Sequence, residues 1–293
     1  MNPVPPAGEP RRRDVVDDAV VTLSAAAVAS PRVDAELLLA HVWGIQRGQL
    51  PAHETVPHAV VADFADLIRR RAAREPLQHL TGHAPFRYVD VEVGPGVFVP
   101  RPETEAMAGW AIDRLAGLAT TRRPIVVELC AGSGAISMAI LDEVPDAHVY
   151  AIELDDGAYR WAARNLAGTG AVLAHGDMAD TGSIWPHLPG ACDVVVANPP
   201  YIPMEAWESV PPEVRDHDPA LALWSVHDGL AATEVVARVA AQLLRSGGAV
   251  ASEHAEVQAQ SAPDVFVHEG SFDEVRDHLD LTGRARFATA RRI

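Results

Sequence analysis

The stretch Ile125-Val126-Val127-Glu128-Leu129-Cys130-Ala131-Gly132-Ser133-Gly134 runs from an apolar segment into a turn with two glycines. A short apolar run that ends in such a turn and is followed by helical spacing predicts a buried strand, a tight turn and a helix. Turns of this kind bring the backbone close to a ligand, because the N–H groups at the start of the helix face it. The stretch therefore predicts one unit of an α/β domain, with either a ligand above the turn or a turn that binds nothing.

The kind of ligand is indicated by what the turn lacks and by an acidic residue farther along. A dinucleotide fingerprint has a third glycine, whereas position 137 is Ser. Glu153 ends the next apolar run, 19 residues after Gly134, where an acid can bind both hydroxyls of a ribose. These residues favour a ligand with a ribose and no pyrophosphate, a description that S-adenosylmethionine fits.

A second stretch indicates the chemistry. Residues 193–197 predict a buried strand, and Asn198-Pro199-Pro200-Tyr201 follows at its carboxyl end, where doubly wound sheets carry their active sites. A proline-rich turn would explain the two prolines but not the Asn and the Tyr that flank them. The tetrapeptide therefore predicts a site that handles a planar nitrogen.

Methyl transfer to such a nitrogen gives each of these residues a task. An amide or aromatic amine nitrogen is a weak nucleophile, because its lone pair is delocalised. We expect the Asn198 side-chain oxygen and the Pro199 main-chain carbonyl to accept its two N–H hydrogens and aim it at a methyl group. The prolines fix φ and remove competing donors, and the Tyr201 ring offers a stacking face. Catalysis by Asn198, Pro199 and Tyr201 then rests mainly on orientation.

Outward from these two stretches, strands and helices alternate along residues 101–293. We predict strands over residues 125–129, 148–153, 171–174, 193–197, 248–253 and 286–290. We predict helices over residues 103–118, 134–143, 156–166 and 228–244. Such alternation predicts a mostly parallel sheet with helices on both faces.

The first hundred residues have a different organisation. Residues 1–13 hold four prolines and predict a disordered tail. Helical spacing near residues 15–23, 33–43 and 57–74 predicts a small helical bundle, which we assign to a domain over residues 14–84. Alternating valines and the turn Gly94-Pro95-Gly96 predict a β-hairpin within residues 86–99, so residues 85–100 form a linker to a second domain over residues 101–293.

Composition excludes several classes of function. The 293 residues have a formal net charge of −16 and include no Lys, which excludes Schiff-base and P-loop lysine chemistry. Most of the acid excess lies in residues 101–293, and this argues against a nucleic-acid enzyme, which needs a positive surface. Cys130 and Cys192 do not make a disulfide framework, and no apolar run approaches the ~20 residues of a membrane span. We predict a cytoplasmic protein with no membrane contact.

Five stretches together carry a resemblance to a known family. The sequence resembles the HemK/PrmC family, the protein-glutamine N5-methyltransferases that modify peptide-chain release factors. The likeness covers nearly all of residues 30–290, and its stretches are residues 74–82, 97–105, 128–134, 198–203 and 281–287. The segment Pro100-Arg101-Pro102-Glu103-Thr104-Glu105 is the most specific to the family, whereas Asn-Pro-Pro-Tyr is shared with adenine N6-methyltransferases.

The resemblance implies a Rossmann-like class I S-adenosylmethionine-dependent methyltransferase domain and an N-terminal helical domain that binds the release factor. The substrate is then the glutamine of a Gly-Gly-Gln loop, methylated at its side-chain nitrogen N5. Separately from the resemblance, we predict a monomer with no metal and no direct contact to nucleic acid. The implied cofactor contacts are Cys130, Ala131, Gly132, Ser133, Gly134, Glu153, Asp177, Met178 and Asn198. The implied substrate contacts are Asn198, Pro199, Pro200, Tyr201, Arg101 and Glu103.

The sequence departs from the family at several places. Cys130 stands where the family usually has Gly, and Glu128 and Glu153 stand where Asp is commoner. Trp224–His227 stand where the family tends to have a Gly-Gly pair. Two other functions stay open: a DNA or RNA adenine N6-methyltransferase, and a non-catalytic module that binds a release factor or the ribosome. The acidic second half and the lack of a basic recognition segment count against the first. The intact Asn-Pro-Pro-Tyr and glycine turn count against the second.

Two further groups of residues invite a binding function. Arg69, Arg70, Arg71 and Arg74 could contact an acidic partner or RNA, or could be a solvated helix end where cations suit the dipole. His79 and His83 are four apart, but Gly82 lies between them, so no helix brings them together as a pair of ligands. We therefore predict no metal site.

Overall fold

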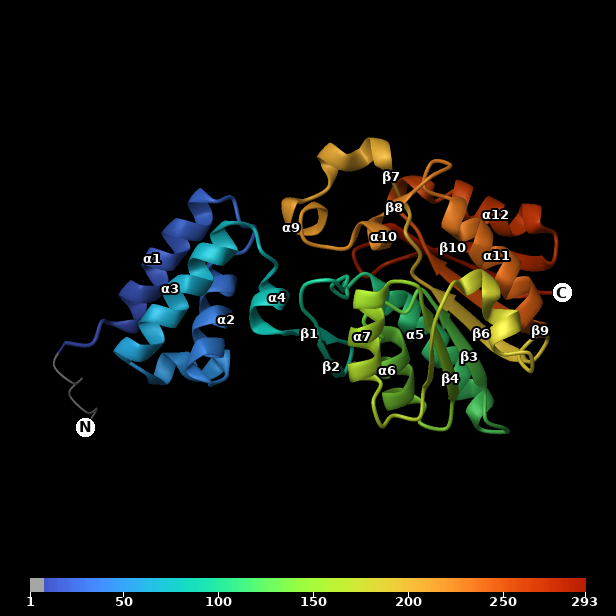
Figure 1. Cartoon of the computed structure of the whole chain (residues 1–293), viewed down its shortest axis with the longest axis horizontal. Helices are drawn as coiled ribbons and strands as arrows, with labels where there is room; N and C mark the ends of the chain where they lie inside the picture. Colours follow the sequence, from blue (N-terminus) through green and yellow to red (C-terminus); the bar gives the residue numbers. More distant parts are fainter. Residues whose placement is uncertain (1–7) are drawn as a thin grey trace. The chain divides into compact units, whose positions relative to one another are not determined.

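The structure, a computed structural model, describes residues 8–293 and divides into two compact units (Figure 1). The helical unit comprises the described residues up to Gly82 together with Pro211–His217. The sheet unit comprises His83–Val210 and Asp218–Ile293. The chain therefore leaves the sheet unit once, contributes a short piece to the helical unit and returns.

The helical unit is a small bundle with its own core. Its elements are α1 (Arg12–Ala25), α2 (Pro31–Trp43), η1 (Arg47–Ala52), α3 (His58–Ala72), α4 (Leu77–Thr81) and α9 (Pro212–Arg215). Val16, Ala19 and Leu23 recur at helical spacing on α1 and are all buried in this core. Helix α2 ends where Gly44 takes a φ of +69°, a left-handed conformation that glycine adopts without steric cost.

The predicted disordered tail is wrong for residues 8–13. Helix α1 already begins at Arg12, and the Arg12 Nε donates to the carbonyl of His53 at 3.0 Å. The amide of Val56 donates to the carbonyl of Pro10 at 3.0 Å. These bonds tie residues 10–12 to the segment before α3, an interaction that proline content does not reveal. The rest of the predicted tail, residues 1–7, lies outside the described residues.

The sheet unit is built on seven strands in the order β10-β11-β9-β6-β3-β4-β5. The strands are β3 (Ile125–Leu129), β4 (His148–Glu153), β5 (Val172–His175), β6 (Cys192–Ala197), β9 (Leu244–Glu253), β10 (Phe272–Leu279) and β11 (Ala285–Arg292). Strands β3, β4, β5, β6 and β9 run parallel, while β11 and β10 are antiparallel additions at one side. The fold is the Rossmann-like class I methyltransferase architecture that the sequence predicts, with strand β10 as an element the prediction missed.

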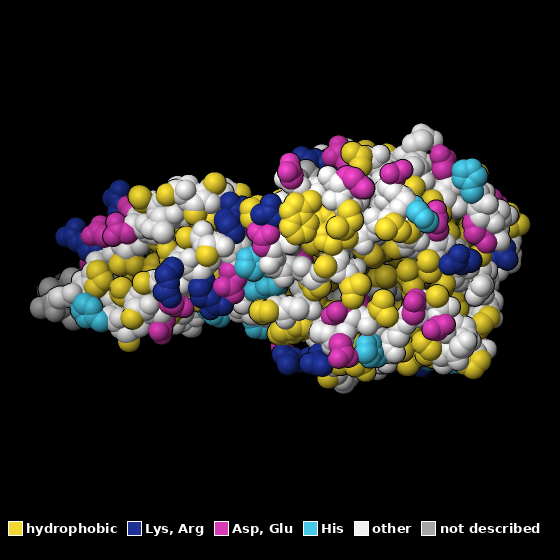
Figure 2. Space-filling view, turned by 45° about the horizontal axis from the view of Figure 1, so that its top comes forward, with side chains coloured by type: hydrophobic (Ala, Val, Ile, Leu, Met, Phe, Trp, Pro, Cys, Tyr) yellow, Lys and Arg dark blue, Asp and Glu magenta, His cyan; other side chains and the backbone are white. Residues whose placement is uncertain are grey.

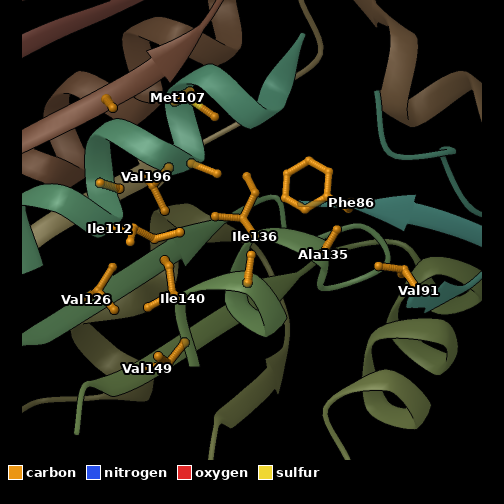
Figure 3. Packing of buried hydrophobic residues seen from close by; sticks show 14 of the residues in the cluster. Phe86, Val91, Met107, Ile112, Val126, Ala135, Ile136, Ile140, Val149 and Val196 are labelled. Atoms are coloured by element: carbon orange, nitrogen blue, oxygen red, sulfur yellow. The ribbon is translucent and has the colours of Figure 1, made fainter. Parts of the chain in front are cut away.

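Helices cover both faces of this sheet, because alternate residues of each strand point to opposite sides. The larger helices are α5 (Thr104–Ala119), α6 (Ala135–Glu143), α7 (Asp156–Asn165), α11 (Ala231–Leu243) and α12 (Ser261–Glu269). Val126 and Val196 pack with α5 and α6, as Figure 3 shows, whereas Val127 and Val195 pack with α11 and α12. Both faces are buried, so the central strands β3 and β6 are mostly apolar, with Glu128 and Asp193 as buried exceptions.

The linker hairpin lies earlier than predicted. Strand β1 (His83–Phe86) pairs with β2 (Val89–Glu92), and the turn falls at Arg87, whose φ is +51°, and Tyr88. The segment Gly94-Pro95-Gly96, which the sequence predicts as the turn, follows the hairpin. Phe86 of β1 reaches the core beside Ile136 (Figure 3), so packing against α6 decides the register.

The chain between β6 and α11 is longer and more irregular than expected. It contains β7 (Ile202–Pro203), η3 (Met204–Ser209), α10 (Ala220–Leu223) and β8 (Trp224–Ser225), with β7 and β8 paired in parallel. Helix α11 begins at Ala231, so the predicted start at residue 228 is wrong, because His227, Asp228 and Gly229 all have a positive φ. The remaining short elements are η2 (Met178–Asp180), α8 (Thr181–Ile184) and η4 (Glu256–Gln258).

Candidate active site

A cavity opens at the carboxyl ends of the parallel strands, the edge where the sequence predicts the site. Predicted site residues that line it are Cys130, Ala131, Gly132, Ser133, Glu153, Asp177, Met178, Asn198, Pro200 and Tyr201. They follow four strands, β3, β4, β5 and β6, which meet at one edge because these strands are parallel. The structure thus brings most of the predicted residues around one cavity.

The turn after β3 is held in left-handed backbone conformations. Cys130 and Gly132 both have a φ of +57°, and Gly134 has a φ of +79° directly before α6. A side chain in this conformation costs about 1–2 kcal/mol, which Gly132 avoids and Cys130 does not. Gly134 does not line the cavity; it lies where α6 begins, against the side chain of Leu166.

Glu153 is fixed in place by the turn opposite it. Its Oε2 accepts the amide of Gly132 at 2.7 Å, and its Oε1 accepts the amide of Asp155 at 2.8 Å. Burial raises the pKa of Glu153 above its ordinary value, against the lowering effect of these backbone hydrogen bonds. Each oxygen keeps a second lone pair, so the carboxylate can still accept hydroxyl hydrogens from a ligand in the cavity.

Two further predicted site residues, Asp177 and Met178, follow strand β5. The Oδ1 of Asp177 accepts the amide of Ala179 at 2.9 Å and caps η2. The Sγ of Cys130 lies 3.7 Å from the Sδ of Met178, so the turn after β3 contacts the turn after β5. Burial raises the pKa of the Cys130 thiol well above its ordinary value, which keeps the thiol protonated and unreactive.

Asn198 sits immediately after the buried strand β6. Its Nδ2 donates to the Oγ1 of Thr104 at 3.4 Å, and this leaves the Oδ1 to accept from a substrate. Thr104 is the first residue of α5 and is 3% exposed. Thr104 also lines the cavity, so it is a site residue that sequence reasoning quoted within a family stretch but did not assign a task.

Tyr201 is held at both of its polar ends. Its phenol donates to the Oε1 of Glu253 at 3.0 Å, and its carbonyl accepts the Nε2 of Gln258 at 3.1 Å. Burial raises the pKa of Tyr201 well above its ordinary value, and the Glu253 carboxylate adds to this, so the phenol stays neutral. Sequence reasoning gave neither Glu253 nor Gln258 a catalytic or binding task. The only signal in the sequence was that Glu253 ends a strand at the same edge of the sheet.

Besides Gly134, three predicted residues do not line the cavity. Arg101 pairs with Asp218 at 2.7 Å, and its guanidinium lies 4.9 Å from the ring centre of Phe98. Glu103 acts at a distance, because its charge contributes to raising the pKa of Glu253. Pro199 is buried. The predicted substrate contacts of these residues therefore stay predictions.

The rest of the wall is largely apolar and was not predicted. It includes Phe86, Phe98, Pro100, Ile202, Pro219, Leu221, Ala222 and Leu223. On the face of the sheet unit seen in Figure 2, hydrophobic side chains gather in the middle, with acidic and histidine side chains around them. Leu221 is 60% exposed, so part of this wall faces solvent.

The four arginines that suggested a binding function have acidic partners within the helical unit. Within the helical unit Arg69 pairs with Asp66, Arg70 with Glu75, and both Arg71 and Arg74 with Glu213. Arg71 is 6% exposed and also bonds Asp34 at 2.8 Å, so it is a buried ion-pair partner and not a solvated helix end. Among residues 8–293, no three His, Cys, Asp or Glu side chains gather as metal ligands would. The same residues contain no helix that is long and apolar enough to span a membrane.

Comparison with protein-family models finds two matches. Residues 14–82 match the PrmC N-terminal domain, and residues 114–209 match the methyltransferase small domain. Among solved structures, the hMettl16 catalytic domain in complex with MAT2A 3′UTR hairpin 6 matches with a TM-score of 0.53 and 13% identity. The match covers 69% of this chain and 74% of that one, and it supports the fold alone.

Sequence relatives match almost the whole chain. A 4-amino-L-phenylalanine/4-methylamino-L-phenylalanine methyltransferase of Streptomyces pristinaespiralis is 41% identical and covers 89% of this chain and 88% of its own length. A release factor glutamine methyltransferase of Streptomyces coelicolor is 49% identical over 278 residues, 94% of this chain and 96% of the relative. Because this likeness spans both the helical unit and the sheet unit, the chain belongs to the release factor glutamine methyltransferase family.

Proposed function

We propose that this protein transfers the methyl group of S-adenosylmethionine to N5, the side-chain amide nitrogen, of the glutamine in the Gly-Gly-Gln loop of peptide-chain release factors. Membership of the family makes the chain an S-adenosylmethionine-dependent methyltransferase. The full-length likeness to a release factor glutamine methyltransferase is the observation that carries the choice of substrate. A planar nitrogen with two hydrogens as the target follows from Asn198 and its neighbours at the cavity.

The cavity suits the cofactor by the chemistry of its walls. Glu153 offers two oxygens for ribose hydroxyls, and the turn at Gly132 lets the backbone come close because nothing lies within 4 Å of where a Cβ would be. Asp177 and Met178 line the same cavity and would flank the adenine base. When bound, S-adenosylmethionine supplies an electrophilic methyl group on a sulfonium. Cys130 to Ser133, Glu153, Asp177, Met178 and Asn198 are the residues we assign to holding it.

The substrate nitrogen is oriented by acceptors and has no need of a base. The Asn198 Oδ1 accepts one amide hydrogen, since its Nδ2 is already engaged by Thr104. The carbonyl of Pro199 accepts the other, and the two prolines offer no N–H that would compete. Tyr201 presents its ring to the planar amide. Holding reacting atoms at roughly 3–3.5 Å in this way supplies most of the catalysis, and the proton leaves once methylation has made it acidic.

The helical unit is assigned to binding the release factor. It has a separate core, and the matched PrmC N-terminal domain spans residues 14–82. Its contribution Pro211–His217 lies in the chain between Tyr201 and the cavity residues Pro219–Leu223, so the helical unit is built partly from the active-site segment. A monomer in the cytoplasm that meets no nucleic acid directly remains our prediction.

An aromatic amine is the competing substrate. The Streptomyces pristinaespiralis relative is named for 4-amino-L-phenylalanine and its methylamino derivative, and Asn-Pro-Pro-Tyr can hold any planar nitrogen with two hydrogens. The sequence alternative of adenine in DNA or RNA has the same nitrogen chemistry. A test of the proposed function therefore compares all three kinds of acceptor.

The experiment offers the purified protein radiolabelled S-adenosylmethionine with release factor, 4-amino-L-phenylalanine, and DNA or RNA in parallel. We expect label in the release factor alone, with mass spectrometry placing one methyl group on the loop glutamine. A release factor with that glutamine replaced by Ala is the matched control and should take no label. Label in the amino acid or in adenine would overturn the substrate assignment.

A further inference from the structure

Glu253 lies behind the active site and makes no part of its wall. It is the last residue of β9, is 1% exposed and does not line the cavity. Its Oε1 accepts the Tyr201 phenol at 3.0 Å. Its Oε2 is buried with no hydrogen-bond partner in the described part of the chain. A buried carboxylate oxygen without a partner is costly, and such exceptions call for a functional explanation.

The Glu253 carboxyl is also connected to Asn198, through Thr104. The Thr104 hydroxyl interacts with Glu253 and lowers its pKa. That hydroxyl oxygen also accepts the Asn198 Nδ2 at 3.4 Å. A hydroxyl that accepts from one neighbour can donate its hydrogen to another. Thr104 therefore links Asn198 to the carboxyl that holds Tyr201.

The main chain of Tyr201 is fixed by the segment that follows Glu253. The Gln258 Nε2 donates to the Tyr201 carbonyl at 3.1 Å and to the Asp228 carbonyl at 2.9 Å. Gly229 packs so closely against Tyr201 that a Cβ on Gly229 would lie 2.2 Å from the main-chain carbonyl oxygen of Tyr201. With its backbone held in this way, the position of the Tyr201 ring depends mainly on what its phenol meets.

We propose that Glu253 is a positioning residue for methyl transfer, which orients the Tyr201 ring through its phenol and the Asn198 amide through Thr104. The proposal rests on the proposed function, because it assumes that Asn198 and Tyr201 hold the substrate nitrogen. Glu253 does not touch the substrate. Its ionised form accepts the hydrogen bond from the Tyr201 phenol and attracts the Thr104 hydroxyl, whereas its protonated form competes with these groups as a donor.

The charges around Glu253 place this change near neutral pH. Burial raises the pKa of Glu253 to about 7, and the Thr104 and Tyr201 side chains and the positive charge of Arg286 oppose the rise. Glu103 adds to the rise from the start of α5. The orienting form of Glu253 therefore predominates above neutral pH and is lost below it.

The experiment is a double-mutant cycle of Glu253→Gln and Tyr201→Phe in the full-length protein, measured by single-turnover methylation of release factor. We expect Glu253→Gln to lower the rate about tenfold, as for loss of one charge-assisted hydrogen bond, and to leave S-adenosylmethionine affinity within about twofold. In the Tyr201→Phe background the same change should cost clearly less than about tenfold, because the contact with the phenol is already gone and only the link through Thr104 remains. Thr104→Val should lower the rate and Thr104→Ser should restore it.

The matched control is Asp277→Asn. Asp277 bonds His254, the neighbour of Glu253, at 2.9 Å and has no contact with Tyr201, so the rate should not change. The wild-type rate should fall below a pH of about 7, and Glu253→Gln should lose that inflection. Additive effects in the cycle, or the same inflection in both proteins, would overturn the proposal.

Urea unfolding of the four proteins in the cycle reads the same contact with no substrate present. We expect the effects of Glu253→Gln and Tyr201→Phe on the free energy of unfolding to be coupled. Additive effects on that free energy would also overturn the proposal. A wild type that binds S-adenosylmethionine but methylates no release factor would overturn the proposed function instead. In that case the unfolding cycle still decides whether Glu253 positions Tyr201.

Discussion

The two ends of the parallel sheet bury acidic side chains in opposite ways. At the amino end, Asp193 on β6 is 0% exposed and accepts from Arg122, from Arg245 at 2.5 Å and from the Ile125 amide at 2.9 Å. At the carboxyl end, Glu128, Glu153 and Glu253 are buried, and no arginine in the described residues hydrogen-bonds to any of them. Full pairing of the buried acid at the amino end and partial pairing at the carboxyl end distinguish the two ends of the sheet, and only the carboxyl end borders the cavity.

The pKa values follow this division. Burial raises the pKa of Asp193, but the hydrogen bonds from Arg122, Ile125 and Arg245 outweigh it and leave that pKa below its ordinary value. Burial raises the pKa of Glu128 to about 8 despite hydrogen bonds from Ser137, and that of Glu253 to about 7. Acids with shifted pKa values near a cavity are typical of a functional site, whereas an acid whose negative charge is paired with arginines is typical of a structural one.

The largest expected effect is on stability against pH. Glu128 and Glu253 have folded-state pKa values above their unfolded ones, so folding favours their protonated forms. The stabilisation is complete below the unfolded value near 4.5 and is lost as the pH rises through about 7 and 8. At about 1.4 kcal/mol per pKa unit, we expect the free energy of unfolding to fall by several kcal/mol between pH 5 and 8.

Urea unfolding at four pH values across this range measures that slope. Asp193 has a lowered pKa, so its contribution is lost only as the pH falls below its ordinary value near 3.8 and does not enter this window. Glu253→Gln should flatten the slope and Asp193→Asn should not. A free energy of unfolding that rises from pH 5 to 8 would contradict the contrast between the two ends.

The next effect is on the rate and is confined to the carboxyl end. Asn198→Ala removes the acceptor that aims the substrate nitrogen, and we expect the single-turnover rate to fall by about 10²–10³, by analogy with loss of an oxyanion-hole donor. S-adenosylmethionine affinity should change by less, because Asn198 is one of several residues around the cofactor. Calorimetry and methylation of release factor measure the two quantities, and a near wild-type rate would reject the orientation mechanism.

The carboxyl end of the sheet was also the part that the sequence predicted best. Strands β3 and β4 have the predicted bounds, because apolar runs that end at Leu129 and Glu153 leave little choice of register. Strand β10 was missed, because Phe272–Leu279 is an edge strand whose exposed residues show no regular alternation. The hairpin turn was misplaced, because Gly94-Pro95-Gly96 is the stronger local signal and only packing of Phe86 selects Arg87.

Pairings between distant residues account for what the sequence did not predict in the site. Strand ends can be predicted locally, but Tyr201 and Glu253 are 52 positions apart, and only the sheet order brings them together. Arg71 and Arg74 meet Glu213 across 142 and 139 positions in the same way. A single sequence shows which residues can ionise and not which of them pair.

A third prediction concerns Glu153, whose two oxygens face both the backbone and the cavity. Glu153→Ala should weaken S-adenosylmethionine binding about ten- to a hundredfold, the range for a charge-assisted hydrogen bond of roughly 1.5–3 kcal/mol. Calorimetry on the folded variant measures it. Glu143→Gln, which alters a half-buried ion pair with Arg87 in the same unit, is the control. Unchanged affinity in Glu153→Ala would reject the ribose assignment.

The amino end should respond in stability and not in rate. Asp193→Ala leaves Arg122 and Arg245 without their shared acid, and both arginines are more than a third exposed, so water compensates in part. We expect a loss of about 2 kcal/mol, below the 3–5 kcal/mol of a fully buried pair. Urea unfolding measures the loss, and the methylation rate well below the melting temperature should stay within about twofold. A large fall in rate would mean that the two ends are not separate.

The smallest effect comes from backbone strain at the carboxyl end, where Cys130 and Gly132 share a φ of +57°. Gly132→Ala meets no atom within 4 Å, so its cost is the left-handed conformation alone, about 1–2 kcal/mol. Cys130→Gly removes the same cost but adds freedom to the unfolded chain, worth about 0.5–1 kcal/mol, and loses the contact with Met178. We therefore expect Cys130→Gly to change the free energy of unfolding by less than about 1 kcal/mol while Gly132→Ala lowers it. Equal losses in both variants would show that side-chain contacts, and not φ, determine the stability of this turn.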